Sequence, residues 1–290
     1  MRVLTIFVRT GTTKYATAEQ ELSEVFQTQL PAVERRTVVV DTALPPCEME
    51  HETNRVVIGG DNSSREFSAF DSAVAHLGDE IWNYDLVNLT TAAFRQLYWD
   101  YLERFRPMVL SAIVGRPVCL GHIDCYNHAI EVFGCRSQHW VRTSCIFLPP
   151  TELRMLGTLV STRDRSEWFS GDPSSPFRPD APLSEEYKKL ITDWLVGNDI
   201  GQGVKWHTRI ALDDENLPEF ERKAMAILNE HLLGIRLRAA GCRTIDVTWL
   251  SGILARHPAN SVDLNTSWWR QLADRDRHAL HVNTLAPVAS

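Results

Sequence analysis

One stretch in the first quarter of the chain has the pattern of a buried strand, a polar turn and a helix. Residues 56–58 are aliphatic, Gly59 and Gly60 follow, and short polar side chains occupy 61–64. Apolar residues then recur at helical spacing, at Phe67, Phe70, Val74 and Leu77. A continuous apolar run that turns directly into a helix is typical of parallel sheets covered by helices, so the stretch predicts an α/β fold.

The polar turn falls at the carboxyl end of the predicted strand. Ligands of open α/β sheets bind at this edge, because strand ends and helix N-termini meet there around one crevice. Asp61 and Asn62 occupy the turn and are candidates for ligand contact. The sequence therefore predicts a small-molecule site.

Composition excludes some classes of protein. The chain has 290 residues, of which 44% are hydrophobic and 23% charged, so it is long enough for one large domain, predicted over 1–290. The net charge of −7 argues against a nucleic-acid partner bound by a broad basic face, while a phosphate-bearing small ligand stays compatible with it.

No segment has the length and hydrophobicity of a membrane span, so no transmembrane segment is expected. The apolar run 3–8 is too short for a signal peptide and is predicted to be the first strand. Without a secretion signal, the six cysteines are expected to be reduced thiols, which predicts a cytoplasmic protein.

The N-terminal third alternates strands and helices. Strands are predicted at 3–8, 37–41, 55–58 and 85–89. Helices are predicted at 17–30, 66–77 and 91–105. This alternation implies a mostly parallel sheet with helices on both faces.

From residue 116 the pattern is mixed. Two strands, 116–121 and 140–148, flank a helical or looped excursion at 126–133, and a proline-rich surface loop covers 161–182. The region 184–240 is predicted to be a C-terminal helical addition, with helices at 184–196 and 218–240, and 244–250 adds one strand.

The turn after the first strand, at 9–12, is where nucleotide-binding α/β folds place a ligand loop. It has neither P-loop nor GxGxxG spacing, so neither an ATPase nor a standard dinucleotide enzyme is indicated. Arg9, Thr10 and Thr12 are candidates for contact with a base or phosphate, and an ordinary polar turn is the alternative. Asp41 ends the second strand, where it would accept hydrogen bonds from a ribose or form a local turn.

Five short motifs follow one another in a fixed order. They are FVRTG at 7–11, GDNSSREFSAFD at 60–71, VNLT at 87–90, GHID at 121–124 and WVRT at 140–143. In this order the chain resembles GT-A-type bacterial glycosyltransferases, especially those related to rhamnan-synthesis proteins, over residues 2–250. The resemblance implies a GT-A-like, Rossmann-like fold that transfers a sugar in polysaccharide biosynthesis. Residues 1–115 would bind the nucleotide-sugar donor, and 116–290 would bind a glycan or lipid-linked acceptor.

The resemblance also implies a set of donor-binding residues. They are Arg9, Thr10, Gly11, Thr12, Asp41, Asp61, Asn62, Arg65 and Asn88. The chain departs from the family at 88–90, because Asn88-Leu89-Thr90 stands where an acidic pair would hold the metal ion and the diphosphate. Two alternatives follow. Either Arg142, Arg163 or Lys205 binds the diphosphate without a metal, or an acid from elsewhere holds Mg²⁺ or Mn²⁺.

An inverting transferase needs a base that deprotonates the acceptor hydroxyl. Glu230 resembles the glutamate that relatives present on a helix before a leucine-rich segment, and Asp124 is the second candidate. Their ordinary alternatives are a solvated helix position for Glu230 and a helix cap for Asp124.

Other readings are weaker. Cys119, His122 and Cys125 have metal-ligating side chains, but their spacing is not a zinc pattern, and no metal site is predicted from them. Several tryptophans are candidates for stacking on sugars: Trp168, Trp194, Trp206, Trp268 and Trp269. A non-catalytic nucleotide or sugar binder of the same fold and an unrelated Rossmann-like enzyme are the alternative functions.

Overall fold

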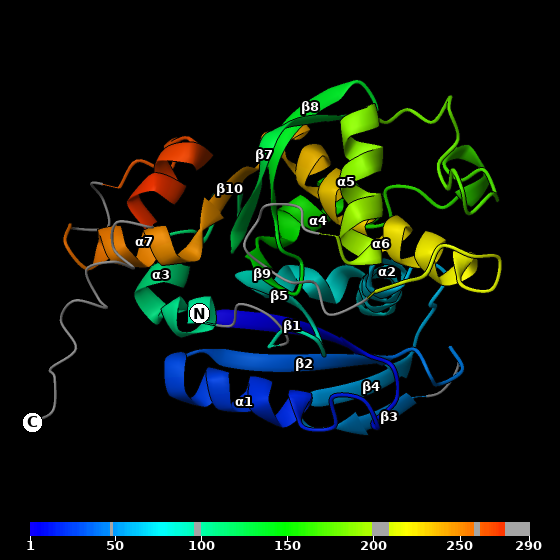
Figure 1. Ribbon diagram of the computed structural model, residues 1–290. Coiled ribbons are helices and arrows are strands. Elements are labelled where there is room, and N and C mark those ends of the chain that lie inside the picture. The colour runs from blue at the N-terminus through cyan, green and yellow to red at the C-terminus, as the bar shows by residue number, and fades with distance from the viewer. Residues whose placement is uncertain (47–48, 96–99, 199–208, 258–261, 276–290) are drawn as a thin grey trace, which may run out of the picture.

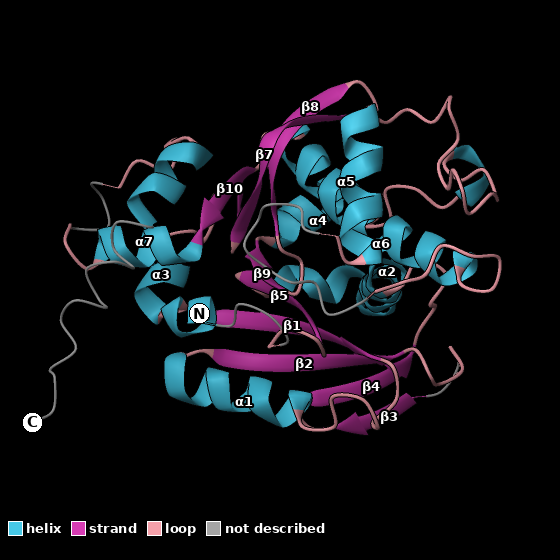
Figure 2. Cartoon of the chain, in the orientation of Figure 1, coloured by secondary structure: helices cyan, strands magenta, loops and turns pink. Residues whose placement is uncertain are grey.

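A mixed eight-stranded sheet with helices on both faces forms the centre of the computed structural model (Figures 1 and 2). The model describes residues 1–46, 49–95, 100–198, 209–257 and 262–275. In spatial order the strands of this sheet are β10 (Arg243–Asp246), β6 (Val118–Gly121), β9 (Cys145–Leu148), β5 (Leu86–Thr91), β1 (Arg2–Arg9), β2 (Glu34–Asp41), β4 (Arg55–Gly59) and β3 (Met49–Glu52). The strands β7 (Ile123–Val132) and β8 (Cys135–Val141) form a separate hairpin.

The helices are short except for one. The helices with both ends among the described residues are α1 (Ala18–Gln29), α2 (Glu66–Leu77), α3 (Pro107–Ser111), α4 (Pro150–Leu156), α5 (Glu185–Val196), α6 (Leu217–Ala239) and α7 (Val247–Leu254), and residues 268–275 are also helical. In the described ranges, 3₁₀ turns occur at Gly78–Asn83, Asp100–Arg104 and Arg165–Glu167. No helix in the described part of the chain has both the length and the apolar character to cross a membrane.

The order of the parallel strands reverses next to β1. Helix α1 links β1 to β2 on one side, whereas α2 links β4 to β5 on the other side of β1. β1 is parallel to both of its neighbours, β2 and β5. The loops after β1 and β5 therefore leave the sheet in different directions, which opens a crevice at their carboxyl ends.

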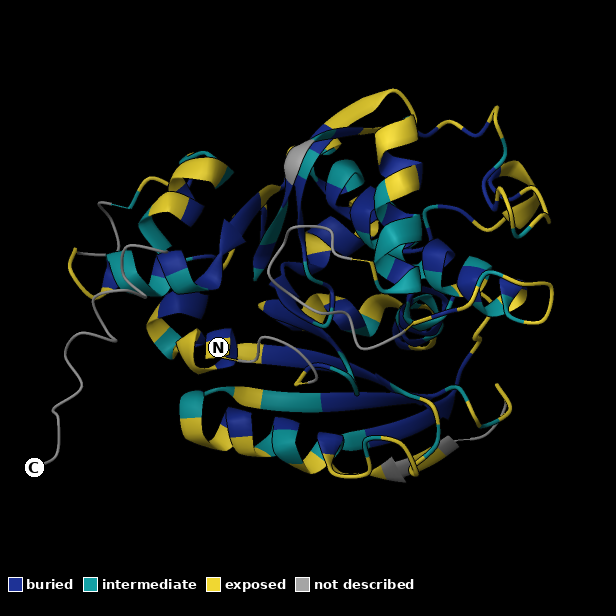
Figure 3. Ribbon diagram, in the orientation of Figure 1, coloured by how far each residue is buried: buried dark blue, intermediate teal, exposed yellow. Residues whose placement is uncertain are grey.

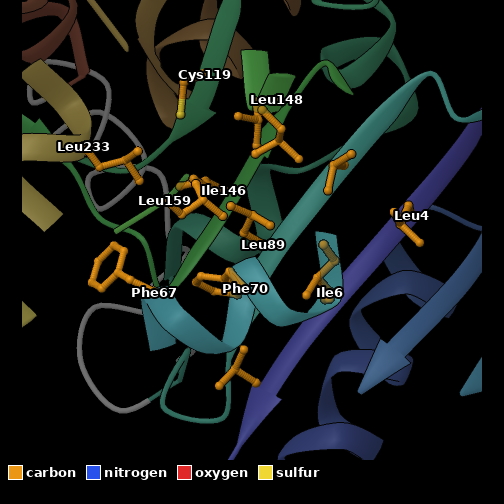
Figure 4. Close-up of a cluster of buried hydrophobic side chains, with 14 of the residues drawn as sticks. Leu4, Ile6, Phe67, Phe70, Leu89, Cys119, Ile146, Leu148, Leu159 and Leu233 are labelled. Atoms are coloured by element: carbon orange, nitrogen blue, oxygen red, sulfur yellow. The ribbon is translucent and has the colours of Figure 1, made fainter. Parts of the chain in front are cut away.

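Alternate residues of β1 enter two different cores, and all of residues 3–8 are buried (Figure 3). Leu4 and Ile6 pack with Phe67 and Phe70 of α2, together with residues of β5, β9 and α6 (Figure 4). The other face of β1 packs against α1, α3 and α7. The chain thus forms three layers, as the apolar run in the sequence predicts.

A third apolar cluster lies between the hairpin and the long helix. Tyr126 and Trp140 of the hairpin pack with Tyr187 of α5 and with Phe220 and Leu228 of α6. This cluster attaches the α5 and α6 region to the sheet, so the hairpin and α6 stand beside the carboxyl ends of β1 and β5.

The α/β class, the mostly parallel mixed sheet and its flanking helices are confirmed. The helix predicted at 66–77 has the bounds of α2, and Ser184 caps α5 by accepting a hydrogen bond from the amide of Tyr187, as expected. Strand β3 was not predicted, because its residues MEHE are mostly charged and it pairs only at the sheet edge.

Four predicted elements are wrong in type or length. The helix predicted at 91–105 contains only a 3₁₀ turn from Asp100, with 96–99 outside the described residues; Pro107 follows closely and disfavours helical backbone before it. Residues 126–132 of the predicted excursion belong to β7, in which Ile130 and Val132 are buried on one face and Glu131 between them is exposed. The strand predicted at 140–148 is two strands with a break at 142–144.

The last strand ends earlier than predicted, at Asp246. The carboxylate of Asp246 accepts a hydrogen bond from the amide of Trp249 at 3.0 Å and so caps α7, which begins at Val247. Because the buried carboxylate of Asp246 caps a helix, the apolar residues that follow it form α7 and do not continue the strand.

Candidate functional site

A cavity of about 610 Å³ lies at the crevice between the carboxyl ends of β1 and β5. The loop after β1, the start of α2, the residues after β5, the hairpin end and one face of α6 line it. Of the predicted site residues, the cavity brings together Arg9, Thr10, Asn62, Arg65, Asp124, Arg142 and Glu230. These residues come from distant parts of the sequence, and the sheet reversal together with the third core cluster places them at one site.

Helix α6 contributes a continuous face to the cavity. The lining residues recur every three or four positions: Glu219, Arg222, Lys223, Ala226, Ile227 and Glu230. The other face of α6, which includes Phe220 and Leu228, is buried in the third cluster. Burial of that face orients Glu230 toward the cavity.

The two carboxylate oxygens of Glu230 have different surroundings. Its Oε1 accepts hydrogen bonds from the backbone amide of Thr143 at 2.7 Å and from the Thr143 hydroxyl at 2.8 Å. Its Oε2 makes no hydrogen bond with any residue that the structure describes. Burial raises the pKa of Glu230 to about 7, with the charge of Glu66 adding to the rise and Thr143 and Arg142 opposing it. A carboxylate that titrates near neutral pH with one unoccupied oxygen has the properties of a general base.

The raised pKa of Glu230 predicts a pH-dependent stability. In the unfolded chain the carboxyl ionises near 4.5, so between pH 4.5 and about 7 the native state holds a proton that the unfolded state has lost. The free energy of unfolding should therefore fall as pH rises through this range. Glu230→Gln does not titrate, and we expect it to be more stable than wild type by about 2 kcal/mol at pH 8, after allowance for partial exposure. Urea unfolding from pH 4 to 8 checks this, and a difference that does not grow with pH would contradict it.

Asp124 occupies a different electrostatic environment. Its Oδ2 accepts a hydrogen bond from Nε of Arg142 at 3.0 Å and forms an ion pair with Nη2 of Arg142 at 2.8 Å, and its Oδ1 lies 3.3 Å from Nε2 of His122. Burial opposes ionisation, but the hydrogen bond from His122 and the charge of Arg142 outweigh it and lower the pKa to about 2. Asp124 is thus a permanent anion with both oxygens engaged. This environment suits a residue that positions Arg142 better than one that accepts a proton.

The predicted residues of the first loop form a scaffold. The carboxylate of Asp41 accepts hydrogen bonds from the amides of Gly11 at 2.8 Å and Ala43 at 3.0 Å, and from Nε of Arg9 at 2.8 Å. Burial opposes its ionisation, but these hydrogen bonds lower the pKa of Asp41. Arg9 also pairs with Glu19 at 2.8 Å, so Asp41 and Gly11 shape the loop while Arg9 and Thr10 line the cavity. The exposed Thr12 lies outside the cavity lining.

Asp61 and Asn88 are placed away from the cavity lining. Asp61 is exposed and accepts hydrogen bonds from the amide of Ser63 at 2.9 Å and from its hydroxyl at 2.5 Å. Asn88 lies inside β5 and not at its end, because the strand continues to Thr91. Its side chain donates a hydrogen bond to the carbonyl of Ile146 at 3.0 Å. Both side chains are thus used in local structure.

The three diphosphate candidates have three different positions. Arg142 lines the cavity, but its guanidinium is paired with Asp124. The side chain of Arg163 is 66% exposed and lies 3.9 Å from Asp71, outside the cavity lining. Lys205 lies outside the described residues.

Sequence reasoning missed several cavity residues. They are Lys14, Tyr15, Glu66, Trp140, Thr143, Glu219, Arg222 and Lys223. The α6 residues Glu219, Arg222 and Lys223 could have been found from the sequence, because Glu219, Lys223 and Glu230 are spaced so that they share one face of a predicted helix. Of the tryptophans proposed for sugar stacking, Trp194 lines the cavity, whereas Trp168 is fully buried and donates to Thr162 at 2.8 Å.

The residues at the cavity do not fit a divalent cation. The end of β5 presents Thr91, Ala92 and Ala93, without a carboxylate. Within the described ranges, no group of three or more His, Cys, Asp or Glu side chains could hold a metal ion, and this includes the surroundings of Cys119 and His122.

The chain was compared with models of protein families, with curated proteins and with solved structures, and none of them matches it.

Proposed function

We propose that the protein is a glycosyltransferase that moves a sugar from a nucleotide-activated donor to a glycan or lipid-linked acceptor. The observation that carries the proposal is the cavity at the strand-order reversal, with Glu230 facing it through an unoccupied carboxylate oxygen. The mostly parallel mixed sheet agrees with the GT-A-like fold that the sequence resemblance implies.

In the proposed inverting reaction, Oε2 of Glu230 accepts the proton of an acceptor hydroxyl. The hydroxyl oxygen forms a bond to the anomeric carbon, and the bond from that carbon to the donor phosphate oxygen breaks. The leaving nucleoside diphosphate takes the electron pair of the broken bond. Thr143 holds the other carboxylate oxygen and so fixes the direction of proton transfer.

The lining suggests how the two substrates would be arranged. Arg9, Thr10 and Asn62 stand at the carboxyl ends of β1 and β4, where the nucleotide of the donor would bind. Trp194 of α5 lines the cavity and offers apolar surface for a sugar ring, whereas Trp140 is buried in the third cluster.

A thermal-shift panel tests the proposal. The purified protein is heated with uridine, thymidine, guanosine and cytidine diphosphates and with NAD, each with Mn²⁺ and with a chelator. A ligand at about a hundred times its dissociation constant adds about 2.7 kcal/mol, which should raise the melting temperature by roughly 5 °C or more. A selective shift with one nucleoside diphosphate supports the proposal, and no shift with any nucleotide contradicts it.

A non-catalytic nucleotide or sugar binder of the same fold is the second candidate. The absence of a carboxylate among the lining residues after β5 favours it, because an acidic pair is expected there in the metal-dependent relatives. Turnover of any sugar nucleotide would exclude this candidate. A shift with NAD alone would favour an unrelated Rossmann-like enzyme.

A further inference from the structure

We propose that Lys14, Arg65, Arg222 and Lys223 form an anion subsite that binds a diphosphate group without a metal ion. All four side chains line the cavity. Assigning this diphosphate to a nucleotide donor rests on the proposed function. The subsite itself is argued from charge and position.

Three separate segments bring these cations together. Lys14 belongs to the loop after β1, Arg65 directly precedes α2, and Arg222 and Lys223 lie on the cavity face of α6. Arg65 reaches across to α6, where its Nη2 lies 3.3 Å from Oε1 of Glu219, a residue 154 positions later in the chain. The cluster is thus a product of tertiary structure and is absent from any local run of basic residues.

One carboxylate is shared among most of the cluster. Glu219 pairs with Arg65, with Arg222 and, at 3.7 Å, with Lys223. The only other carboxylate in this part of the described lining is Glu66, and burial raises its pKa, which disfavours its charged form. Among the described lining residues, the four cations therefore exceed the negative charge of Glu219 and Glu66 by at least two, which is the charge that a diphosphate would supply.

The positive charges of the cluster repel one another. Burial lowers the pKa of Lys223, and the charges of Arg65, Lys14 and Arg222 lower it further. Nε of Arg65 is buried and makes no hydrogen bond with a described residue. A bound anion would lessen the repulsion further than Glu219 does and would accept the hydrogen bond of this Nε.

The position of the cluster fits the direction of the proposed reaction. Arg222 and Glu230 are eight residues apart on one face of α6, about 12 Å along a helix with a rise of about 1.5 Å per residue. A diphosphate on the cluster therefore leaves room for a sugar between it and the base. Arg142, which sequence reasoning considered for the diphosphate, is already paired with Asp124.

Isothermal titration of inorganic pyrophosphate and of nucleoside diphosphates, in EDTA, tests the subsite. The variant Arg222→Met/Lys223→Met removes two cluster charges. Its control, Arg136→Met/Lys189→Met, removes two exposed charges outside the cavity lining. We expect the cluster variant to bind pyrophosphate at least about 100-fold more weakly, because each of the two lost charged hydrogen bonds contributes about 10-fold or more, and the control to bind like wild type.

Further measurements in the same experiment distinguish the possible outcomes. Equal binding by the two double variants, or binding that requires Mn²⁺, would overturn the proposal. If the cluster variant does not fold, Lys14→Met in the exposed loop should still weaken binding several-fold, and unchanged binding there would also overturn it. Tighter binding of a nucleoside diphosphate than of pyrophosphate identifies the donor as the source of the group, whereas equal binding points to a lipid diphosphate.

Failure of the subsite and failure of the proposed function are distinguishable. Metal-free pyrophosphate binding that depends on the cluster, without turnover of any sugar nucleotide, would leave the subsite standing and remove the transferase. Sugar transfer that is unchanged when the cluster charges are removed would exclude the subsite and support the transferase.

Discussion

Replacing Glu230 by Gln is expected to lower the rate of sugar transfer by about 10²- to 10⁴-fold, the usual contribution of a general base. The amide keeps an oxygen that accepts the two hydrogen bonds from Thr143, so the local structure should persist. It cannot accept the proton of the acceptor hydroxyl. Release of nucleoside diphosphate from the donor found in the thermal-shift panel measures the rate.

The pH profile gives an independent readout of the same group. With a pKa of about 7 for Glu230, the wild-type rate should fall as pH falls through 7, because protonation removes the base. Glu230→Gln should lack this limb. Glu215→Gln, an exposed acid just before α6, is the matched control and should retain both rate and profile. Near wild-type turnover by Glu230→Gln would show that another residue is the base.

Replacing Arg142 by Met is expected to destabilise the protein by about 3 kcal/mol, because removing one partner of a buried ion pair leaves the other charge uncompensated. Only 16% of the Arg142 side chain and 22% of that of Asp124 are exposed, and Arg142 donates a hydrogen bond from Nε to the carboxylate and places Nη2 2.8 Å from it. Urea unfolding at pH 7 measures the loss.

A double-mutant cycle decides whether the loss belongs to the pair. Asp124→Asn/Arg142→Met removes both charges and should recover a large part of the stability that Arg142→Met alone loses. The deficit of the single variant should also shrink at low pH, because wild type loses the contribution of Asp124 as pH falls from 3.8 toward 2. Equal losses in the single and double variants would mean that Asp124 and Arg142 do not stabilise each other.

Local sequence patterns predicted much of the frame. The apolar strand, polar turn and helix around Gly60 formed as expected, because apolar periodicity and turn chemistry act over neighbouring residues. The same signals failed at 126–133, where β7 exists through its pairing with β8 and its packing against α5 and α6. Strand formation in that segment depends on partners that are distant in sequence.

The candidate site, like the fold, was predicted from the sequence only in part. The sequence resemblance pointed to Glu230 as the first candidate for the base, with Asp124 as the second candidate, and both line the cavity. Their surroundings make them different: Arg142 and His122 hold Asp124 as an anion, while burial and Glu66 raise the pKa of Glu230. A pKa depends on burial and on charges that the fold brings near, and no local pattern contains them.

The sequence alone determined the α/β class, the edge of the sheet where a ligand would bind and the residue types available there, because these follow from short-range periodicity and from where strands end. Only the tertiary structure decided which side chains share the cavity. It turned Asp41, Asp61 and Asn88 to structural hydrogen bonds, and it gathered Lys14, Arg65 and one face of α6 at the cavity. The physical reason is that long-range packing sets the direction of each helix face and strand end, and with it the electrostatic environment of every charged group.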